Sequence, residues 1–174
     1  GRGAVLGFRR EMAESSGSGF DPEKYRMLLW EKKNYKFRNY RRAHTKSVLF
    51  PGCNFPSLYP QTTAVLVKML SEKAGIGVAY DCCGKPIAEL GLVNDEQSII
   101  AGINKRLKDS GVEEVIMVCP NCYSFLKDRL EVRVVSIYEK LTELGLGDRI
   151  SGGSFVFMPC PDREGGELLA QIEY

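Results

Sequence analysis

Short apolar runs alternate with helical patterns from residue 47 onward, and this alternation constrains the fold more than any other feature of the chain. Four apolar runs bounded by turn-forming residues predict strands at 47–50, 76–80, 115–118 and 132–135, and a fifth run predicts a last strand at 154–158. Strands that alternate with helices form a mainly parallel sheet covered on both faces.

The segments between these runs carry apolar residues at three- and four-residue spacing, several of them after a proline. We expect helices at 56–73, 86–92, 95–110, 120–130 and 136–145. Crossover connections between parallel strands are right-handed. The predicted fold class is therefore α/β, with an open, mainly parallel sheet and helices on both faces, of the Rossmann or flavodoxin-like type.

The first 46 residues have a different composition and are predicted to form a basic N-terminal arm with a helix. A Ser/Gly-rich stretch at 15–19 is typical of a flexible linker, and Asp21-Pro22-Glu23 is typical of a helix start, so we predict a helix over 22–43. The remaining residues, 47–174, are predicted to form one cysteine-rich domain.

The charge of the chain is concentrated in this arm. Residues 21–46 contain nine basic and three acidic side chains, whereas the net charge of the whole chain is only +2. A basic arm on a mildly acidic body is suited to docking an acidic partner, nucleic acid or anionic lipid, and it equally fits a solvated helix face. We favour a protein partner over nucleic acid.

The overall composition is that of a soluble globular protein. Hydrophobic residues make up 44% and charged residues 26% of the chain. We expect neither a transmembrane segment nor a signal peptide, because no apolar stretch is long enough to span a bilayer. We expect a cytoplasmic location, with any membrane association made through a partner.

The cysteines all follow predicted strands, where topology can gather them. They are Cys53 after the first strand, Cys82 and Cys83 after the second, Cys119 and Cys122 after the third, and Cys160 after the last. Binding sites in parallel sheets form beyond the carboxyl ends of the strands. We therefore expect cysteines that are far apart in the sequence to meet at one edge of the sheet.

The residues beside these cysteines favour thiolates. Pro56, Pro86 and Pro120 each lie near a predicted helix start, where free backbone N–H groups and a partial positive charge stabilise an anionic sulfur. Gly52 and Gly84 allow the sharp turns that such a site needs.

Three kinds of cysteine chemistry fit part of this pattern. Cys119-Pro120-Asn121-Cys122 is a CxxC turn, which occurs in zinc sites, iron–sulfur clusters and redox-active pairs. Adjacent cysteines such as Cys82 and Cys83 are poor chelators of one tetrahedral ion, but they can bind different irons of one cluster. A structural zinc site made by Cys53, one of that pair, Cys119 and Cys122 is the alternative, and it leaves one thiol without a role.

The order of these motifs resembles a known family. Pro51-Gly52-Cys53 is followed by Cys82-Cys83-Gly84-Lys85-Pro86 and then by Cys119-Pro120-Asn121-Cys122-Tyr123. There are 28 residues between Cys53 and Cys82, and 35 between Cys83 and Cys119. This arrangement is similar to the cysteine-rich CCG domain of heterodisulfide reductase, which is shared with the iron–sulfur subunits of glycolate and lactate oxidases.

The resemblance implies a noncubane [4Fe-4S] cluster held by Cys53, Cys82, Cys83, Cys119 and Cys122. In heterodisulfide reductase this cluster cleaves a disulfide, so the cluster iron rather than a side chain is expected to contact the substrate. The family typically carries two such domains, and 158–163 (Met-Pro-Cys-Pro-Asp-Arg) resembles the opening of a second motif. The usual His-Asp is replaced by Phe157-Met158, and Cys160 is expected either to flank the cluster or to be a free thiol.

We therefore predict an iron–sulfur oxidoreductase domain or subunit. It is expected to pass electrons to or from a disulfide or thiol substrate or a flavoprotein or ferredoxin-like partner. The alternative is a zinc-stabilised interaction domain without redox chemistry. Lys85 and Arg163 are candidates for neutralising cluster charge, and Tyr59 and Tyr123 are candidates for covering it; an ordinary structural role is equally compatible with each.

Overall fold

The strands form a mainly parallel sheet in the computed structural model, which describes residues 22–147, 158–163 and 165–172. In these residues the strand order is β1-β3-β2-β4-β5. The strands are β1 (Asn39–Arg42), β2 (Ser47–Phe50), β3 (Gly77–Tyr80), β4 (Glu114–Met117) and β5 (Arg133–Ser136). Strands β2 to β5 pair in parallel, and β1 pairs antiparallel to β3 at one edge.

This arrangement confirms the predicted α/β class with a mainly parallel sheet. The four strands predicted between residues 47 and 136 are found within one residue of their expected bounds. The predicted strand at 154–158 falls on residues 148–157, outside the described part of the chain, except for Met158.

The central strands are buried on both faces because alternate side chains enter two separate cores. Val48 and Phe50 of β2 pack into one core, and Leu49 between them packs into the other. In β4, Val115 and Met117 enter the first core and Ile116 enters the second. Continuous apolar runs are therefore required in these strands, which explains why the sequence identifies them.

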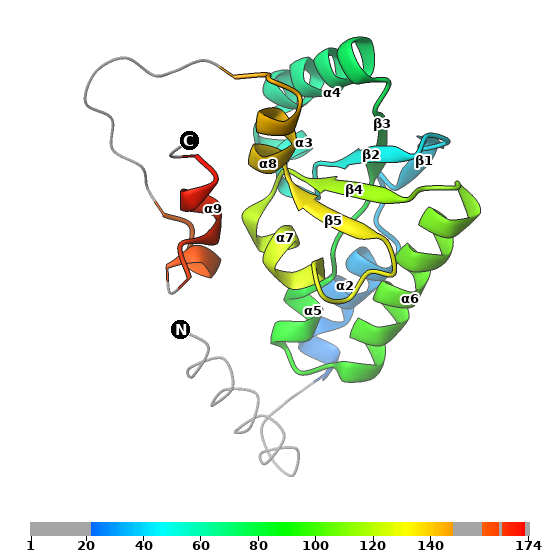
Figure 1. The fold of residues 1–174 in the computed structure, drawn as a ribbon. Helices are drawn as coiled ribbons and strands as arrows, with labels where there is room; N and C mark the ends of the chain where they lie inside the picture. Colours follow the sequence, from blue (N-terminus) through cyan, green and yellow to red (C-terminus); the bar gives the residue numbers. More distant parts are fainter. Residues whose placement is uncertain (1–21, 148–157, 164, 173–174) are drawn as a thin grey trace.

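Helices cover both faces of the sheet. They are α2 (Pro22–Lys33), α3 (Asn54–Leu58), α4 (Pro60–Ala74), α5 (Lys85–Glu89), α6 (Val93–Asp109), α7 (Pro120–Leu126), α8 (Ile137–Glu143), the 3₁₀ turn η1 (Cys160–Asp162) and α9 (Glu167–Ala170). Figure 1 shows α4 and α8 on one side of the sheet and α5, α6 and α7 on the other.

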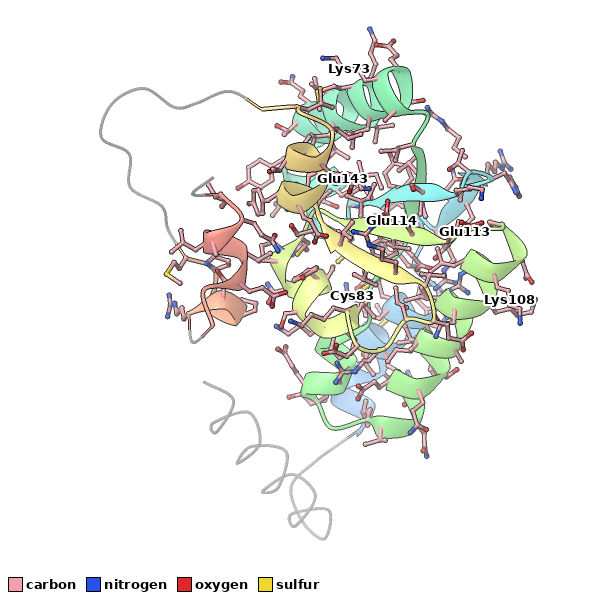
Figure 2. The ribbon with its side chains drawn as sticks, in the orientation of Figure 1. Lys73, Cys83, Lys108, Glu113, Glu114 and Glu143 are labelled. Atoms are coloured by element: carbon pink, nitrogen blue, oxygen red, sulfur yellow. The ribbon has the colours of Figure 1, made fainter. Side chains whose placement is uncertain are left out.

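Lys73 and Lys108 project outward from α4 and α6, whereas Cys83 lies inside the molecule (Figure 2). No helix in the described ranges combines the length and apolar character that a membrane span requires.

The helix predicted over 56–73 is instead two helices, α3 and α4, which meet at Tyr59. Tyr59 leaves the helical conformation with φ −131° and ψ 58°, and Pro60 starts α4. Proline cannot donate a backbone hydrogen bond and restricts the residue before it, so the break falls at Tyr59. The division gives Cys53 a short helix of its own, because α3 begins directly after it.

The helix predicted over 22–43 is wrong beyond Lys33, where α2 ends. Arg38 donates from its guanidinium to the Lys33 carbonyl oxygen at 2.8 Å, and the chain then enters β1. Pairing of β1 with β3 replaces the helical hydrogen bonds that this stretch would otherwise make. A long-range contact thus outweighs the local pattern.

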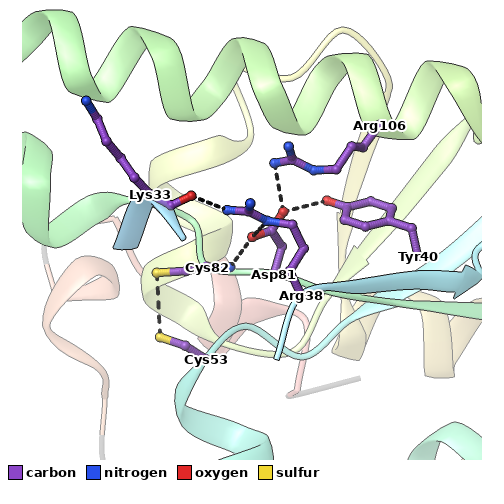
Figure 3. A network of polar contacts seen from close by, with 7 residues as sticks. All are labelled: Lys33, Arg38, Tyr40, Cys53, Asp81, Cys82 and Arg106. Atoms are coloured by element: carbon purple, nitrogen blue, oxygen red, sulfur yellow. Dashed lines mark hydrogen bonds and ion pairs between the residues drawn. The ribbon is translucent and has the colours of Figure 1, made fainter. Parts of the chain in front are cut away.

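A buried carboxylate fixes the position of β1. Asp81 directly follows β3 and is fully buried. It accepts hydrogen bonds from Arg38 Nε at 3.0 Å, the Tyr40 hydroxyl at 3.0 Å, Arg106 at 2.9 Å and the Cys82 backbone N–H at 2.8 Å (Figure 3). A buried carboxylate is costly unless donors and positive charge compensate it, and here four donors do so. We call Asp81, Arg38, Tyr40 and Arg106 the Asp81 cluster.

Replacing Tyr40 with phenylalanine tests this cluster, because the change removes one hydroxyl and keeps the ring. We expect the free energy of unfolding to fall by about 1.5–3 kcal/mol, as is typical of a lost hydrogen bond to a charged group. Urea denaturation measures the change. Tyr59→Phe is the matched control, because Tyr59 is 57% exposed, and its effect should stay within about 0.5 kcal/mol. Equal effects of the two substitutions would contradict the role given to the cluster.

Candidate functional site

Five cysteines lie at the carboxyl ends of three adjacent strands. Cys53 follows β2, Cys82 and Cys83 follow β3, and Cys119 and Cys122 follow β4. In the sheet β2 lies between β3 and β4, so the chain leaves β2 toward one neighbour and later returns on its other side. Ligand sites in parallel sheets form at such a switch of strand order.

The sulfur atoms of these cysteines form a continuous series. Cys53 and Cys82 lie 3.9 Å apart between their Sγ atoms (Figure 3). The Cys82 thiol also interacts with Cys83, Cys83 with Cys122, and Cys122 with Cys119. The structure thus brings together all five cysteines that the sequence singled out. We call this set the five-thiol site.

Two glycines allow the backbone turns beside these cysteines. Gly52 has φ 75°, and a Cβ atom there would lie 2.9 Å from Cys122 Sγ. Gly84 has φ 81°, and a Cβ atom there would lie 2.8 Å from Cγ2 of Ile99. Any other residue would strain the backbone and push against a neighbour at either position. The turns expected at Gly52 and Gly84 are therefore present.

Cys119 has the environment of a thiolate. Its contact with the Cys122 thiol, the backbone N–H groups of Cys122 and Asn121, and the charge of Lys85 together lower its pKa to about 6, although burial opposes them. The two N–H groups belong to the start of α7, for which Cys119 is the N-cap. Lys85 is held in place by a hydrogen bond from Nζ to Oδ1 of Asn121 at 2.6 Å.

The other four thiols compete for protons. Contacts with the thiols of Cys122 and Cys82 lower the pKa of Cys83, helped by the Lys85 backbone N–H. The Cys53 thiol lowers the pKa of Cys82, but contact with Cys83 and burial outweigh it and raise that pKa to about 11. Contact with Cys82 raises the pKa of Cys53, and contact with Cys119 raises that of Cys122.

The competition of these thiols for protons bears on whether the site suits a metal–sulfur group. Thiols this close cannot all ionise unless positive charge is supplied between them, and metal ions supply it while binding thiolate sulfur. The donors are all sulfur, which favours zinc, copper(I) or iron–sulfur clusters over magnesium or calcium. The residues present therefore fit a sulfur-ligated metal group.

Two residues that the sequence analysis missed face the site from the segment before it. Burial lowers the pKa of Lys32, but a hydrogen bond to Glu31 and the charges of Cys82 and Cys53 raise it further. Burial and the same two sulfurs raise the pKa of Tyr35 to about 12. No local motif marks Lys32 or Tyr35, because only the folding of α2 and β1 against the sheet brings them here.

The two tyrosines that were candidates for covering the site, and Cys160, differ in their burial. Tyr123 is buried in α7 with its hydroxyl donating to Glu167, whereas Tyr59 is largely exposed. Cys160 is exposed on η1. Within the described residues no hydrogen bond joins its sulfur to the five-thiol site. It is therefore structurally distinct from the other five.

Comparisons with known proteins single out the part of the chain that carries the five-thiol site. Residues 47–127 match the family model of the cysteine-rich domain called CCG. The chain is also similar to an EtfAB:quinone oxidoreductase of Syntrophomonas wolfei, with 31% identity over 88 residues. That alignment covers 47% of this chain and 12% of the relative, so the chain corresponds to a small part of that protein. No solved structure matches the chain.

The matched residues include all five cysteines of the site and exclude Cys160. They also contain β2, β3 and β4, the strands whose ends carry the thiols. Residues 47–127 of this chain therefore match the family model of the cysteine-rich CCG domain over the part of the chain that carries the five thiols.

Proposed function

We propose that the five-thiol site binds one iron–sulfur cluster and that the domain transfers electrons. The observation that carries this proposal is the continuous series of sulfur contacts across the switch between β2 and β4. When bound, an iron–sulfur cluster supplies one-electron chemistry and an iron site that can bind sulfur. The similarity to an oxidoreductase supports a redox role.

The geometry favours a multi-iron group over a single ion. A structural zinc ion needs four ligands around one point. Five thiols contact one another here, from Cys53 through Cys82, Cys83 and Cys122 to Cys119, which is one more than a tetrahedral zinc ion takes. Five thiols that include an adjacent pair suit several metal ions bridged together.

The residues around the thiols would stabilise a negatively charged cluster. Backbone N–H groups of Gly84 and Lys85 point at Cys82 and Cys83, and those at the start of α7 point at Cys119. Such hydrogen bonds to ligand sulfur, and the exclusion of water, help set a cluster's potential. Four of the thiols are buried and Cys53 is half-buried, so Cys53 marks the side from which a substrate or partner can approach.

The finer assignment follows the family pattern. We propose a noncubane [4Fe-4S] cluster with Cys53, Cys82, Cys83, Cys119 and Cys122 as ligands, working with a flavoprotein or ferredoxin-like partner in a heterodisulfide reductase-like manner. The name of the relative, which pairs EtfAB with a quinone, supports exchange with a redox partner. A cytoplasmic location, where thiols stay reduced, suits such a site.

Metal analysis of anaerobically purified protein tests the proposal against the zinc alternative. We expect brown protein that contains iron and acid-labile sulfide, with electron paramagnetic resonance of a multi-iron cluster after oxidation or reduction. Colourless protein with stoichiometric zinc and no sulfide would contradict the proposal and favour a structural metal site.

Cys83→Ser tests whether the adjacent pair is needed for the cluster. Because Cys83 lies in the middle of the series, its loss should remove most of the iron or change the paramagnetic spectrum of what remains. Cys160→Ser is the matched control, since Cys160 is exposed and outside the matched residues. It should keep its iron and its spectrum. An unchanged spectrum in Cys83→Ser, or loss of iron in Cys160→Ser, would overturn the five-ligand assignment.

A further inference from the structure

An open hollow of about 430 Å³ lies between the start of α4, α3 and the β1–β3 edge of the sheet. Its lining residues include the aromatic residues Tyr35, Phe37 and Tyr80 and the polar residues Asn39 and Ser57. Its volume is within the range of small-molecule sites, which are mostly apolar with a few placed polar groups. We call it the aromatic hollow.

The aromatic hollow adjoins the Cys53 end of the five-thiol site. Ser57, in its wall, donates to the Cys53 carbonyl oxygen at 3.0 Å. Tyr80, also in its wall, is separated from Cys82 by Asp81 alone. Cys53 is also the least buried of the five thiols. The hollow therefore adjoins the segment that carries the least buried of the five thiols.

The lining favours a neutral ring compound. No charged side chain is among the residues that line the hollow in the described part of the chain. The ammonium of Lys32, which lies near Cys53 and Cys82, is already hydrogen-bonded to Glu31 and is therefore not a free partner for an anion. Aromatic walls pack well against flat rings.

Tyr35 supplies a hydrogen-bond donor to this space. Tyr35 is buried and is among the residues that line the hollow. A tyrosine hydroxyl is a hydrogen-bond donor. A carbonyl oxygen on the ligand is the matching acceptor.

We propose that the aromatic hollow binds an uncharged, flat, ring-bearing small molecule with a carbonyl oxygen, which accepts a hydrogen bond from Tyr35 beside Cys53. One part of this inference rests on the proposed function: if the site transfers electrons, the bound ligand would be the molecule that exchanges electrons with it. Binding itself does not depend on which metal the thiols hold.

Binding of 1-tetralone to the full chain tests the proposal, because this neutral bicyclic ketone does not alkylate thiols. Saturation-transfer difference NMR measures it beside two analogues, tetralin without the carbonyl and a tetralone carboxylate with a negative charge. We expect 1-tetralone to bind at least about tenfold more tightly than either, which corresponds to about one hydrogen bond. Equal binding of the carboxylate would overturn the proposed ligand class.

Three variants locate the binding. Ala64→Leu fills the wall of the hollow from α4 and should abolish 1-tetralone binding, whereas Thr62→Leu, on the same helix outside the lining, should leave it unchanged. Tyr35→Phe should bind 1-tetralone and tetralin alike. Undiminished 1-tetralone binding in folded Ala64→Leu protein, or an intact preference for the ketone in Tyr35→Phe, would refute the proposal.

Measuring the metal content of the same samples separates the two proposals. Ketone binding by protein that contains zinc would sink the iron–sulfur proposal and leave the binding site standing. A brown, iron-containing protein that binds none of the three probes would contradict the binding site in the hollow and leave the iron–sulfur proposal standing.

Discussion

The site depends on one topological constraint, which is that parallel strands end at the same edge of a sheet. Cys53 and Cys122 are separated by most of the matched domain, yet the turn at Gly52 brings the first motif against Cys122. The paired strands β2, β3 and β4 bring the three motifs to one edge, and the buried cores on both faces of the sheet hold those strands in register. The scaffold thus holds the five thiols close together, and a site whose groups are already in place costs less entropy to assemble around a ligand.

The negative charge of ionised thiols is the second constraint, and several groups around the site compensate it. Backbone N–H groups at the starts of α5 and α7 donate to thiol sulfurs of the site, Lys85 adds positive charge near Cys119, and Lys32 adds it near Cys53 and Cys82. Behind Cys82 the carboxylate of Asp81 is compensated by Arg38 and Arg106, so it adds little net negative charge of its own. The segment before the matched residues thereby contributes to the surroundings of the site, although it lies outside the family match.

The sequence predicted the central strands and the meeting of the five cysteines because both follow from local patterns and a general rule of topology. Leu49 and Ile116 belong to uninterrupted apolar runs, which only strands buried on both faces require. It did not predict β1 or the Asp81 cluster, because Tyr40 and Asp81 are 41 positions apart and nothing local links them. The same limit explains why Tyr35 was missed, and why residues 34–43 were expected to continue a helix that ends at Lys33.

Iron K-edge X-ray absorption of the purified protein tests the central claim most directly, because it reports the atoms around the metal rather than its amount. We predict a first shell dominated by sulfur together with scattering from neighbouring iron atoms, and loss of that iron–iron signal when Cys53 is replaced by alanine. An iron first shell of nitrogen or oxygen, or sulfur coordination without any metal neighbour, would contradict a multi-iron cluster assembled by the five thiols.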